Sequence, residues 1–475
     1  MSVNSRSDND LSNNAQYFQT AWNEEIASEA TFARPMGSLR RRKAAIALTA
    51  IWSGTIVLHW ISWSLWIVLG LTSLMGIHAW RVLRVRSRDR LFSATADGAS
   101  ELGDFPQIAL LVAAKDEEAT IAQTIEQLCG LDYPRDRYEV LAIDDCSSDG
   151  TLTILKQLER QYDCLRIVRR SAHAGGGKSG ALNLALRLSR SDIVAVFDAD
   201  ARVPSDVLKR VVPRFRRDRV GAVQMRKAIS NSSVNFWTRA QSAEMALDAF
   251  FQQQRIALGG IGELRGNGQF IRRTALDRCG RFNEDTITDD LDLTIRLHLD
   301  GWDIDFLSVL AVEEEGVTGA IALWHQRSRW AEGGYQRYFD YWRALVRNPM
   351  GTRKTVDLLA FMMTQYVLPT AAVPDSLMAM ARSRLPLLAP MTGVAIAMSL
   401  CGMMAGLRRI RQLETGDRGG FFALAGQTLR GTLYMMHWLA VMAATTARVA
   451  VRPKRLKWVK TVHRGDAGME KCAHR

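Results

Sequence analysis

The chain has 475 residues, of which 47% are hydrophobic and 23% are charged. This length and apolar content exclude a mostly disordered chain and leave room for more than one domain. The formal net charge of +13 would suit a nucleic-acid-binding protein, but the sequence contains no zinc-finger, helix-turn-helix or RNA-binding pattern. The six cysteines are scattered without metal-ligand spacing, which predicts reduced structural thiols.

The first part of the chain predicts a tail and a membrane anchor. Residues 1–43 are polar and basic, and we expect a loose tail there. Residues 44–80 contain no Lys, Arg, Asp or Glu, and this run is about twice the ~20 residues that one membrane helix needs. Basic stretches at 40–43 and 81–90 flank it, so the positive-inside rule places both ends on the cytoplasmic side. The pattern predicts a transmembrane hairpin whose basic flanks bind anionic membrane lipids.

A polar stretch of one large domain, residues 95–355, follows the hairpin. Four short apolar runs alternate there with amphipathic helical patterns, at 107–114, 138–144, 165–170 and 192–198. This alternation predicts an α/β domain built on a doubly wound, mostly parallel sheet.

The C-terminal region, 356–450, is again apolar, and a basic tail, 451–475, ends the chain. Three full spans from a cytoplasmic domain would place this basic tail outside, against the positive-inside rule. We therefore expect one segment to be interfacial or re-entrant: either the first, with Pro369 and Pro374, or the last, with Arg430. The whole layout predicts a multi-pass integral membrane protein with a cytoplasmic middle domain.

Polar residues follow all four predicted strands, at the sheet edge where ligands of such folds bind. Each of them alone is typical of a turn or a helix cap. Because the fold brings the four edges into one crevice, together they predict a binding site. They are Glu117 after the first strand, Asp144 and Asp145 after the second, Lys178 in a glycine-rich loop after the third, and Asp198 and Asp200 after the fourth.

These residue types suit a nucleoside diphosphate. Carboxylates accept hydrogen bonds from a uracil N–H and from ribose hydroxyls, and the Asp198-x-Asp200 pair can direct one carboxylate to a divalent cation that bridges two phosphates. Lys178 adds a mobile positive charge. Its loop lacks the first glycine of a P-loop, which argues against an ATP or GTP hydrolase.

Three further motifs follow along the chain. The stretch 265–276 offers a glycine-lined turn with Gly266 and Gly268, and Asp289 and Asp290 begin a helix pattern. An acidic first helical turn explains these two aspartates structurally, although they form a further acidic cluster in a domain that already has two. The last motif places polar and aromatic residues on consecutive helical turns near the membrane region, where an amphipathic interfacial helix is the alternative; they are Gln326, Arg329 and Trp330.

Seven stretches now stand in order over residues 108–330: AAKDEE, DDCSSDG, GKSGALN, DAD, GNGQFIRR, TDD and QRSRW. In this order they resemble the family 2 inverting glycosyltransferases with a GT-A fold. The resemblance implies Asp290 as the general base and a magnesium ion, with manganese as an alternative, at Asp198 and Asp200. It also implies two groups of binding residues. The nucleotide sugar would contact Glu117, Asp144, Asp145, Lys178, Asp198, Gln326, Arg329 and Trp330, and Gly266, Gly268 and Asp289 would position donor and acceptor.

The sequence departs from the family pattern at two positions. Asp116 stands where many members carry Asn, and Asp289 stands where many carry Glu. Both changes keep the polarity of the position, so we expect the same reaction.

The layout of hairpin, middle domain and the ending RPKRLKWVKTVH also resembles cyanobacterial lipid glucosyltransferases. This resemblance implies UDP-glucose as donor, 1,2-diacylglycerol as acceptor and β-monoglucosyldiacylglycerol as product. Two alternatives stay open: a processive β-glycan synthase of the cellulose or hyaluronan type, and an inactive nucleotide-sensing membrane scaffold. The second would have lost the base or the Asp-x-Asp pair, and neither is lost here.

Overall fold

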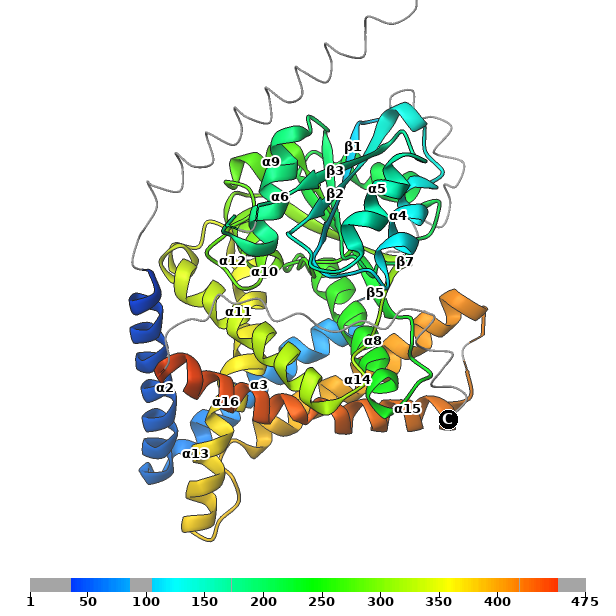
Figure 1. Ribbon diagram of the computed structural model, residues 1–475. Coiled ribbons are helices and arrows are strands. Elements are labelled where there is room, and N and C mark those ends of the chain that lie inside the picture. Colours follow the sequence, from blue (N-terminus) through cyan, green and yellow to red (C-terminus); the bar gives the residue numbers. More distant parts are fainter. Residues whose placement is uncertain (1–35, 86–104, 172, 418, 452–475) are drawn as a thin grey trace, which may run out of the picture.

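The computed structural model describes residues 36–85, 105–171, 173–417 and 419–451. Most of the predicted N-terminal tail and nearly all of the basic C-terminal tail lie outside these residues. The described chain forms a sheet domain that stands on a group of long helices (Figure 1).

The sheet has seven strands in the order β3-β2-β1-β4-β6-β5-β7. Strands β3, β2, β1 and β4 are mutually parallel, which confirms the α/β fold with a parallel sheet for this half. Strand β6 runs antiparallel to both of its neighbours, so the whole sheet is mixed. The bounds are β1 Ile108–Ala114, β2 Tyr138–Asp144, β3 Leu165–Arg169, β4 Ile193–Phe197, β5 Val220–Ile229, β6 Gln269–Arg272 and β7 Asp303–Glu314.

Helices cover both faces of the sheet. In β1, Leu110 belongs to one buried cluster and Leu111 to the other, because successive side chains of a strand point to opposite faces. Both faces are therefore core, which explains the continuous apolar runs of the parallel strands. The helices of this domain are α4 Ile121–Cys129, α5 Thr151–Glu159, α6 Gly177–Leu188, α7 Val207–Val211, α8 Phe236–Ala257, α9 Arg273–Arg278, α10 Asp289–Leu299 and α11 Ala320–Arg347.

A second group of helices lies below the sheet in Figure 1. Three stretches are long and apolar enough to cross a membrane: Ser64–Arg84, Thr352–Ala381 and Ala389–Thr415. The helices are α2 Met36–Trp60, α3 Ser64–Arg84, α12 Thr352–Met362, α13 Leu368–Ala381, α14 Ala389–Thr415, α15 Phe421–Met435 and α16 His437–Val451, and the π-helical turn η5 Met363–Val367 joins α12 to α13.

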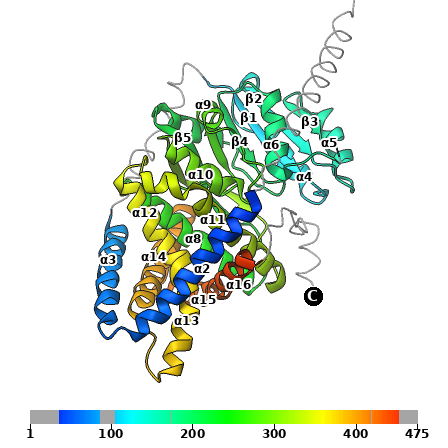
Figure 2. The same cartoon turned by 90° about the vertical axis from the view of Figure 1, so that its left-hand side faces the viewer.

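The apolar run 44–80 contains two helices, α2 and α3, joined by a short turn at residues 61–63. The two helices diverge from this turn (Figure 2), and α3 packs against α14 while α2 packs against α13 and α16. Two residues of the basic stretch before this run contact helix α11 of the same chain. Arg40 is buried and pairs with Asp340 of α11 at 2.5 Å, and Lys43 donates to the carbonyl of Phe339 at 2.6 Å.

The structure separates the two candidates for the interfacial segment. The first continues as helix through Pro369 and Pro374 and remains long enough to span. The last divides at Met436 into α15 and α16, which have 15 residues each. Helices of that length extend about 22 Å, less than the ~30 Å of a bilayer core. This division favours the last segment as the interfacial one.

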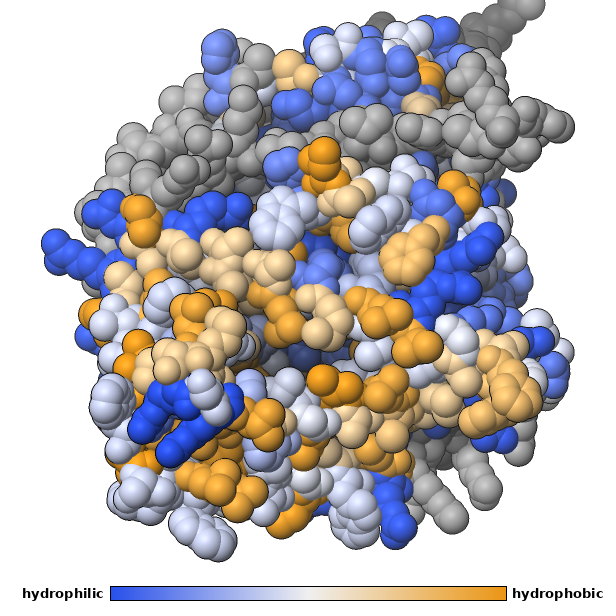
Figure 3. Space-filling model, turned by 90° about the horizontal axis from the view of Figure 1, so that it is seen from below, coloured by the Kyte–Doolittle hydropathy of each residue, from blue (hydrophilic) through white to orange (hydrophobic). Residues whose placement is uncertain are grey.

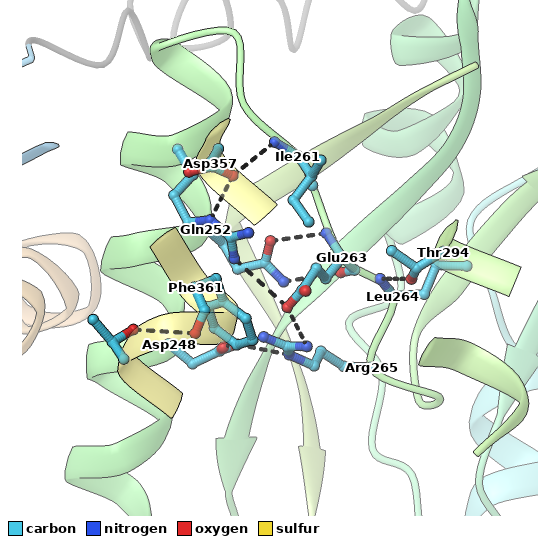
Figure 4. A network of polar contacts seen from close by, with 12 residues as sticks. Asp248, Gln252, Ile261, Glu263, Leu264, Arg265, Thr294, Asp357 and Phe361 are labelled. Atoms are coloured by element: carbon cyan, nitrogen blue, oxygen red, sulfur yellow. Dashed lines mark hydrogen bonds and ion pairs between the residues drawn. The ribbon is translucent and has the colours of Figure 1, made fainter. Parts of the chain in front are cut away.

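A buried ionic network joins the sheet domain to the helices below it (Figure 4). Glu263, in the segment between α8 and β6, is fully buried and lies 2.9 Å from Arg337 of α11 and 2.8 Å from Arg265. Asp357 of α12 accepts hydrogen bonds from Arg255 of α8 at 2.9 Å and from the Ile261 N–H at 3.0 Å. Burial alone would raise the pKa of Glu263, but the arginines hold it well below its usual value. The segment that leads into the GNG motif is thus fixed by charge pairing.

Candidate active site

One cavity of about 1590 Å³ collects nearly all the residues that the sequence predicted for the site. Asp145, Asp200 and Asp290, which lie far apart along the chain, all line it. The shared crevice that the strand ends predict is therefore present. The other predicted residues that line it are Glu117, Lys178, Asp198, Gly266, Asp289, Gln326, Arg329 and Trp330.

Two predicted residues, Asp144 and Gly268, do not line the cavity. The carboxylate of Asp144 is fully buried, and one of its oxygens accepts the Ser147 N–H at 3.3 Å. Gly268 has a φ of +67°, and a Cβ there would lie 2.6 Å from the side chain of Val312 in β7. Glycine is needed at this position because a larger residue would collide with β7.

The Asp-x-Asp pair is held by contacts to three different segments. Lys178, at the start of α6, lies 2.5 Å from Asp198. The Asp198 N–H donates to Asn267 of the GNG motif at 3.2 Å, and Asp200 accepts the Glu315 N–H at 3.0 Å. Burial would lower the pKa of Lys178, but Asp198 and Asp289 raise it above its usual value, so this lysine stays charged.

Asp289 and Asp290 occupy the first turn of α10, where Thr288 is the N-cap residue. Burial and the neighbouring charge of Asp289 raise the pKa of Asp290 to about 6. Gly266, with a φ of +81°, brings the GNG loop close, because a Cβ there would lie 3.4 Å from the Asp290 carboxylate. A carboxylate with such a pKa is suited to accept a proton near neutral pH.

Helix α11 brings the last motif to the same cavity. It crosses so close to α10 that a Cβ on Gly333 would collide with Thr288, and glycine permits this approach. Two side-chain oxygens of the site, in Gln326 and Asp289, are buried and have no hydrogen-bond partner among the described residues. Buried polar atoms of this kind are expected to bind a ligand.

An ion pair at the cavity wall was not predicted from the sequence. Lys227 of β5 lies 2.6 Å from Glu314 of β7, and both side chains line the cavity. The sequence signal for this pair was the acidic run at residues 313–315, which precedes a glycine. This run points to a cavity residue only when β7 is known to be a strand that ends there. Lys227 also lies 5.7 Å from the ring centre of Trp330, so it supplies positive charge beside the motif helix.

Arg327, inside the QRSRW motif, was also missed. It is 1% exposed and pairs with Glu244 of α8 at 2.6 Å. Its guanidinium lies 4.0 Å from the ring centre of Trp330 and 5.7 Å from that of Trp438 in α16. Arg327 therefore connects the Trp330 ring to α8 and to the helices below.

Asp198 and Asp200 are the residues that fit a divalent cation. No group of three His, Cys, Asp or Glu side chains among the described residues is placed to hold a metal ion. Magnesium commonly takes only one or two carboxylates from the protein and completes its oxygen shell with substrate phosphates and water. The donor set thus suits a cation that arrives with a diphosphate.

The fold and the site together indicate the class of enzyme. A mixed, mostly parallel sheet with carboxylates, a lysine and an aspartate of raised pKa around one cavity is the arrangement of a sugar-nucleotide-dependent glycosyltransferase.

Comparison with known proteins gives the family. Residues 106–333 match the model for "Glycosyltransferase like family 2". The chain is 61% identical to a β-monoglucosyldiacylglycerol synthase of Trichormus variabilis over 427 residues, which is 90% of each chain. It is 55% identical to the protein of that name in Synechocystis over 94% of each chain. The chain belongs to glycosyltransferase family 2, in a group with these synthases.

A solved structure shows that the fold is shared. The mannosyltransferase PcManGT of Pyrobaculum calidifontis, determined with GDP-mannose and Mn²⁺, matches with a TM-score of 0.51 at 22% identity. The match covers 83% of this chain and 99% of the mannosyltransferase. It confirms the GT-A fold expected from the motifs.

We predict that Arg327→Lys lowers kcat/KM for the sugar nucleotide by about tenfold, because lysine keeps the charge but loses the planar stack on Trp330. Glu244→Gln should act in the same direction. The control is Arg343→Lys, since Arg343 lies over the exposed Trp342 on the same helix, 5.5 Å from its ring centre. Steady-state kinetics in detergent micelles measure the effect, and equal values for Arg327→Lys and Arg343→Lys would contradict it.

Proposed function

We propose that this enzyme transfers glucose from UDP-glucose to 1,2-diacylglycerol and releases β-monoglucosyldiacylglycerol and UDP. The observation that carries the proposal is the extent of the cavity. The space that holds Asp198 and Asp290 continues between α13, α14 and α16, where Ala372, Gly393 and Leu439 line it. A lipid hydroxyl can therefore meet a nucleotide sugar without the lipid leaving an apolar environment.

The two named synthases support both substrates, because their names specify glucose and diacylglycerol and they match the chain over nearly its whole length. The carboxylates of Glu117 and Asp145 would accept hydrogen bonds from the uracil and ribose. The cations Lys178, Lys227 and Arg329 line the same cavity and would face the diphosphate.

Asp290 would act as the general base in a single displacement. Its carboxylate takes the proton of the acceptor hydroxyl as that oxygen attacks C1 of glucose from the face opposite the diphosphate. The C1–oxygen bond to the diphosphate breaks, UDP leaves and the configuration at C1 inverts. The cationic side chains around the phosphates stabilise the charge that develops on the leaving group.

Asp198 and Asp200 would hold magnesium, with manganese as the alternative. When bound, the ion would neutralise charge on the two phosphates of the donor. The protein needs no third carboxylate to bind this ion, because the phosphates would supply the remaining oxygen ligands.

The protein is proposed to be a multi-pass membrane protein with its sheet domain on the cytoplasmic side. The three apolar stretches described above supply three spans, and α2, with 25 residues, would supply a fourth, so that both basic flanks of the hairpin lie on the same side of the membrane. The basic residues that flank α2 and α3 favour this orientation by the positive-inside rule. Anionic lipid headgroups would contact the basic residues that do not pair within the protein.

The purified enzyme in phospholipid vesicles with dioleoylglycerol and radiolabelled UDP-glucose should yield one glucolipid, with the β anomer identified by NMR. We predict that Asp290→Asn lowers kcat by about 10²–10⁴-fold, the usual contribution of a general base, while the affinity for UDP stays within about twofold. A water-soluble labelled polymer would support a processive synthase instead. If no radiolabel appears in the lipid fraction, the enzyme does not glucosylate lipid and the proposal is wrong.

The pH dependence should report the base. Because Asp290 accepts a proton only as the carboxylate, and because its pKa is raised to about 6, kcat/KM should fall as the pH drops through about 6. Asp289→Asn removes the nearby negative charge, which lowers the pKa of Asp290, so the acid limb should move to lower pH. The control is Asp206→Asn, because Asp206 is half-buried, pairs with Arg210 and does not line the cavity. An acid limb that stays in place in Asp289→Asn would contradict the assignment of the base.

A further inference from the structure

The lower part of the active-site cavity is a chamber between helices of the group below the sheet. Its walls come from three of them, and apolar side chains dominate. We define this chamber by Pro369 and Ala372 of α13, Gly393 and Ile396 of α14, and Leu439 and Met442 of α16. Since these elements follow the sheet domain in sequence, the chamber is formed only when the C-terminal helices pack beneath it.

The one carboxylate that α13 contributes to this region is hydrogen-bonded to neighbouring residues. Asp375 is 3% exposed and accepts hydrogen bonds from the Leu387 and Leu388 N–H groups at 2.9 and 3.1 Å. His59 of α2 lies 2.8 Å from the same carboxylate. Its hydrogen-bonding capacity is used to cap the start of α14, so it does not make the chamber a polar site.

The cavity is larger than one ligand requires. Its volume of about 1590 Å³ exceeds the ~300–1,000 Å³ of ordinary small-molecule pockets. Asp198, Asp290 and Lys178 lie at the sheet end of the cavity, and the chamber lies at the other end. This division leaves apolar space beyond the part that a nucleotide sugar fills.

The face of the molecule below the sheet domain is predominantly hydrophobic around a central hollow (Figure 3). The large apolar side chains exposed on the helices of this region include Leu377, Leu429 and Leu433. Contact of such a surface with lipid is favourable, whereas its exposure to water raises the free energy. A hydrocarbon chain against this face would therefore contact apolar side chains rather than water.

We infer that the chamber binds the acyl chains of the diacylglycerol acceptor while its free hydroxyl lies at Asp290. This inference rests on the proposed function and adds the site of the lipid tails, with α13 and α14 as its walls. Burial of hydrocarbon in the chamber would contribute to acceptor affinity in proportion to the apolar area removed from water. It follows that the chamber selects acceptors by their chains, whereas the upper part of the cavity selects the sugar nucleotide.

Gly393 provides a direct test, because it lines the cavity and a Cβ added there meets no atom within 4 Å. Gly393→Leu would place a side chain in space that the tails occupy, without a clash in the protein. Ala372→Leu narrows the chamber from the facing helix. The matched control is Gly70→Leu in α3, since Gly70 also has nothing within 4 Å but does not line the cavity.

The experiment compares dioleoylglycerol with dihexanoylglycerol as acceptor in mixed micelles, with UDP-glucose as donor. Displacing two methylenes from the chamber should lower kcat/KM for dioleoylglycerol by about tenfold in Gly393→Leu and Ala372→Leu. The same variants should use dihexanoylglycerol within about twofold of the unmodified enzyme, because short chains need less of the chamber. Gly70→Leu should match the unmodified enzyme with both acceptors.

Two results would overturn the inference: unchanged use of dioleoylglycerol by both chamber variants, or an equal loss with both acceptors. Failure of the proposed function would look different, since the unmodified enzyme would then glucosylate neither diacylglycerol. UDP affinity, measured by calorimetry, should stay unchanged in all three variants and reports that the sheet domain is intact.

Discussion

The structure depends on holding several carboxylates around one cavity. Burial raises the pKa of Asp289, Asp290 and Glu314, and repulsion between like charges adds to this effect. Asp198 contributes to the repulsion at Asp289 and Glu314. Two lysines balance this charge, Lys178 against Asp198 and Lys227 against Glu314. The remaining negative charge is what a cation bound to a diphosphate would complement, and the raised pKa of Asp290 is what a proton acceptor needs.

Two helices couple this chemistry to the membrane region. Helix α8 packs against β5 on one side and α14 on the other, and α11 packs against α10 and α16. Helix α11 thus carries the QRSRW motif between the sheet domain and the helices below (Figure 1). The ionic network around Glu263 fixes the same junction, because its arginines come from α8, α11 and the segment before β6. A shift of α14 or α16, which pack against α8 and α11, would therefore move Trp330 and the GNG loop.

Much of this could be predicted from local patterns. Strands β1, β2 and β4 are short apolar runs buried on both faces, whereas the edge strand β3 is exposed at Arg166 and Arg169. All four strands lie within one residue of the predicted runs 107–114, 138–144, 165–170 and 192–198. Strands β5 and β7 could not be recognised in the same way, since register shifts interrupt their pairing and β7 is only partly buried. Lys227 and Glu314 were missed for that reason. The burial of Arg40 against Asp340 depends on a tertiary contact between residues 300 positions apart, which no local pattern encodes.

One cavity would bring a sugar nucleotide and the tails of its lipid acceptor together. Photolabelling can check this with a diacylglycerol that carries a diazirine at the end of one acyl chain, in the presence of saturating UDP. Crosslinks are expected at the chamber residues of α13 and α14, and an excess of unlabelled dioleoylglycerol should reduce them. Crosslinks confined to lipid-facing positions such as Ile46, Leu65 and Leu74, which are exposed on α2 and α3, would contradict this arrangement.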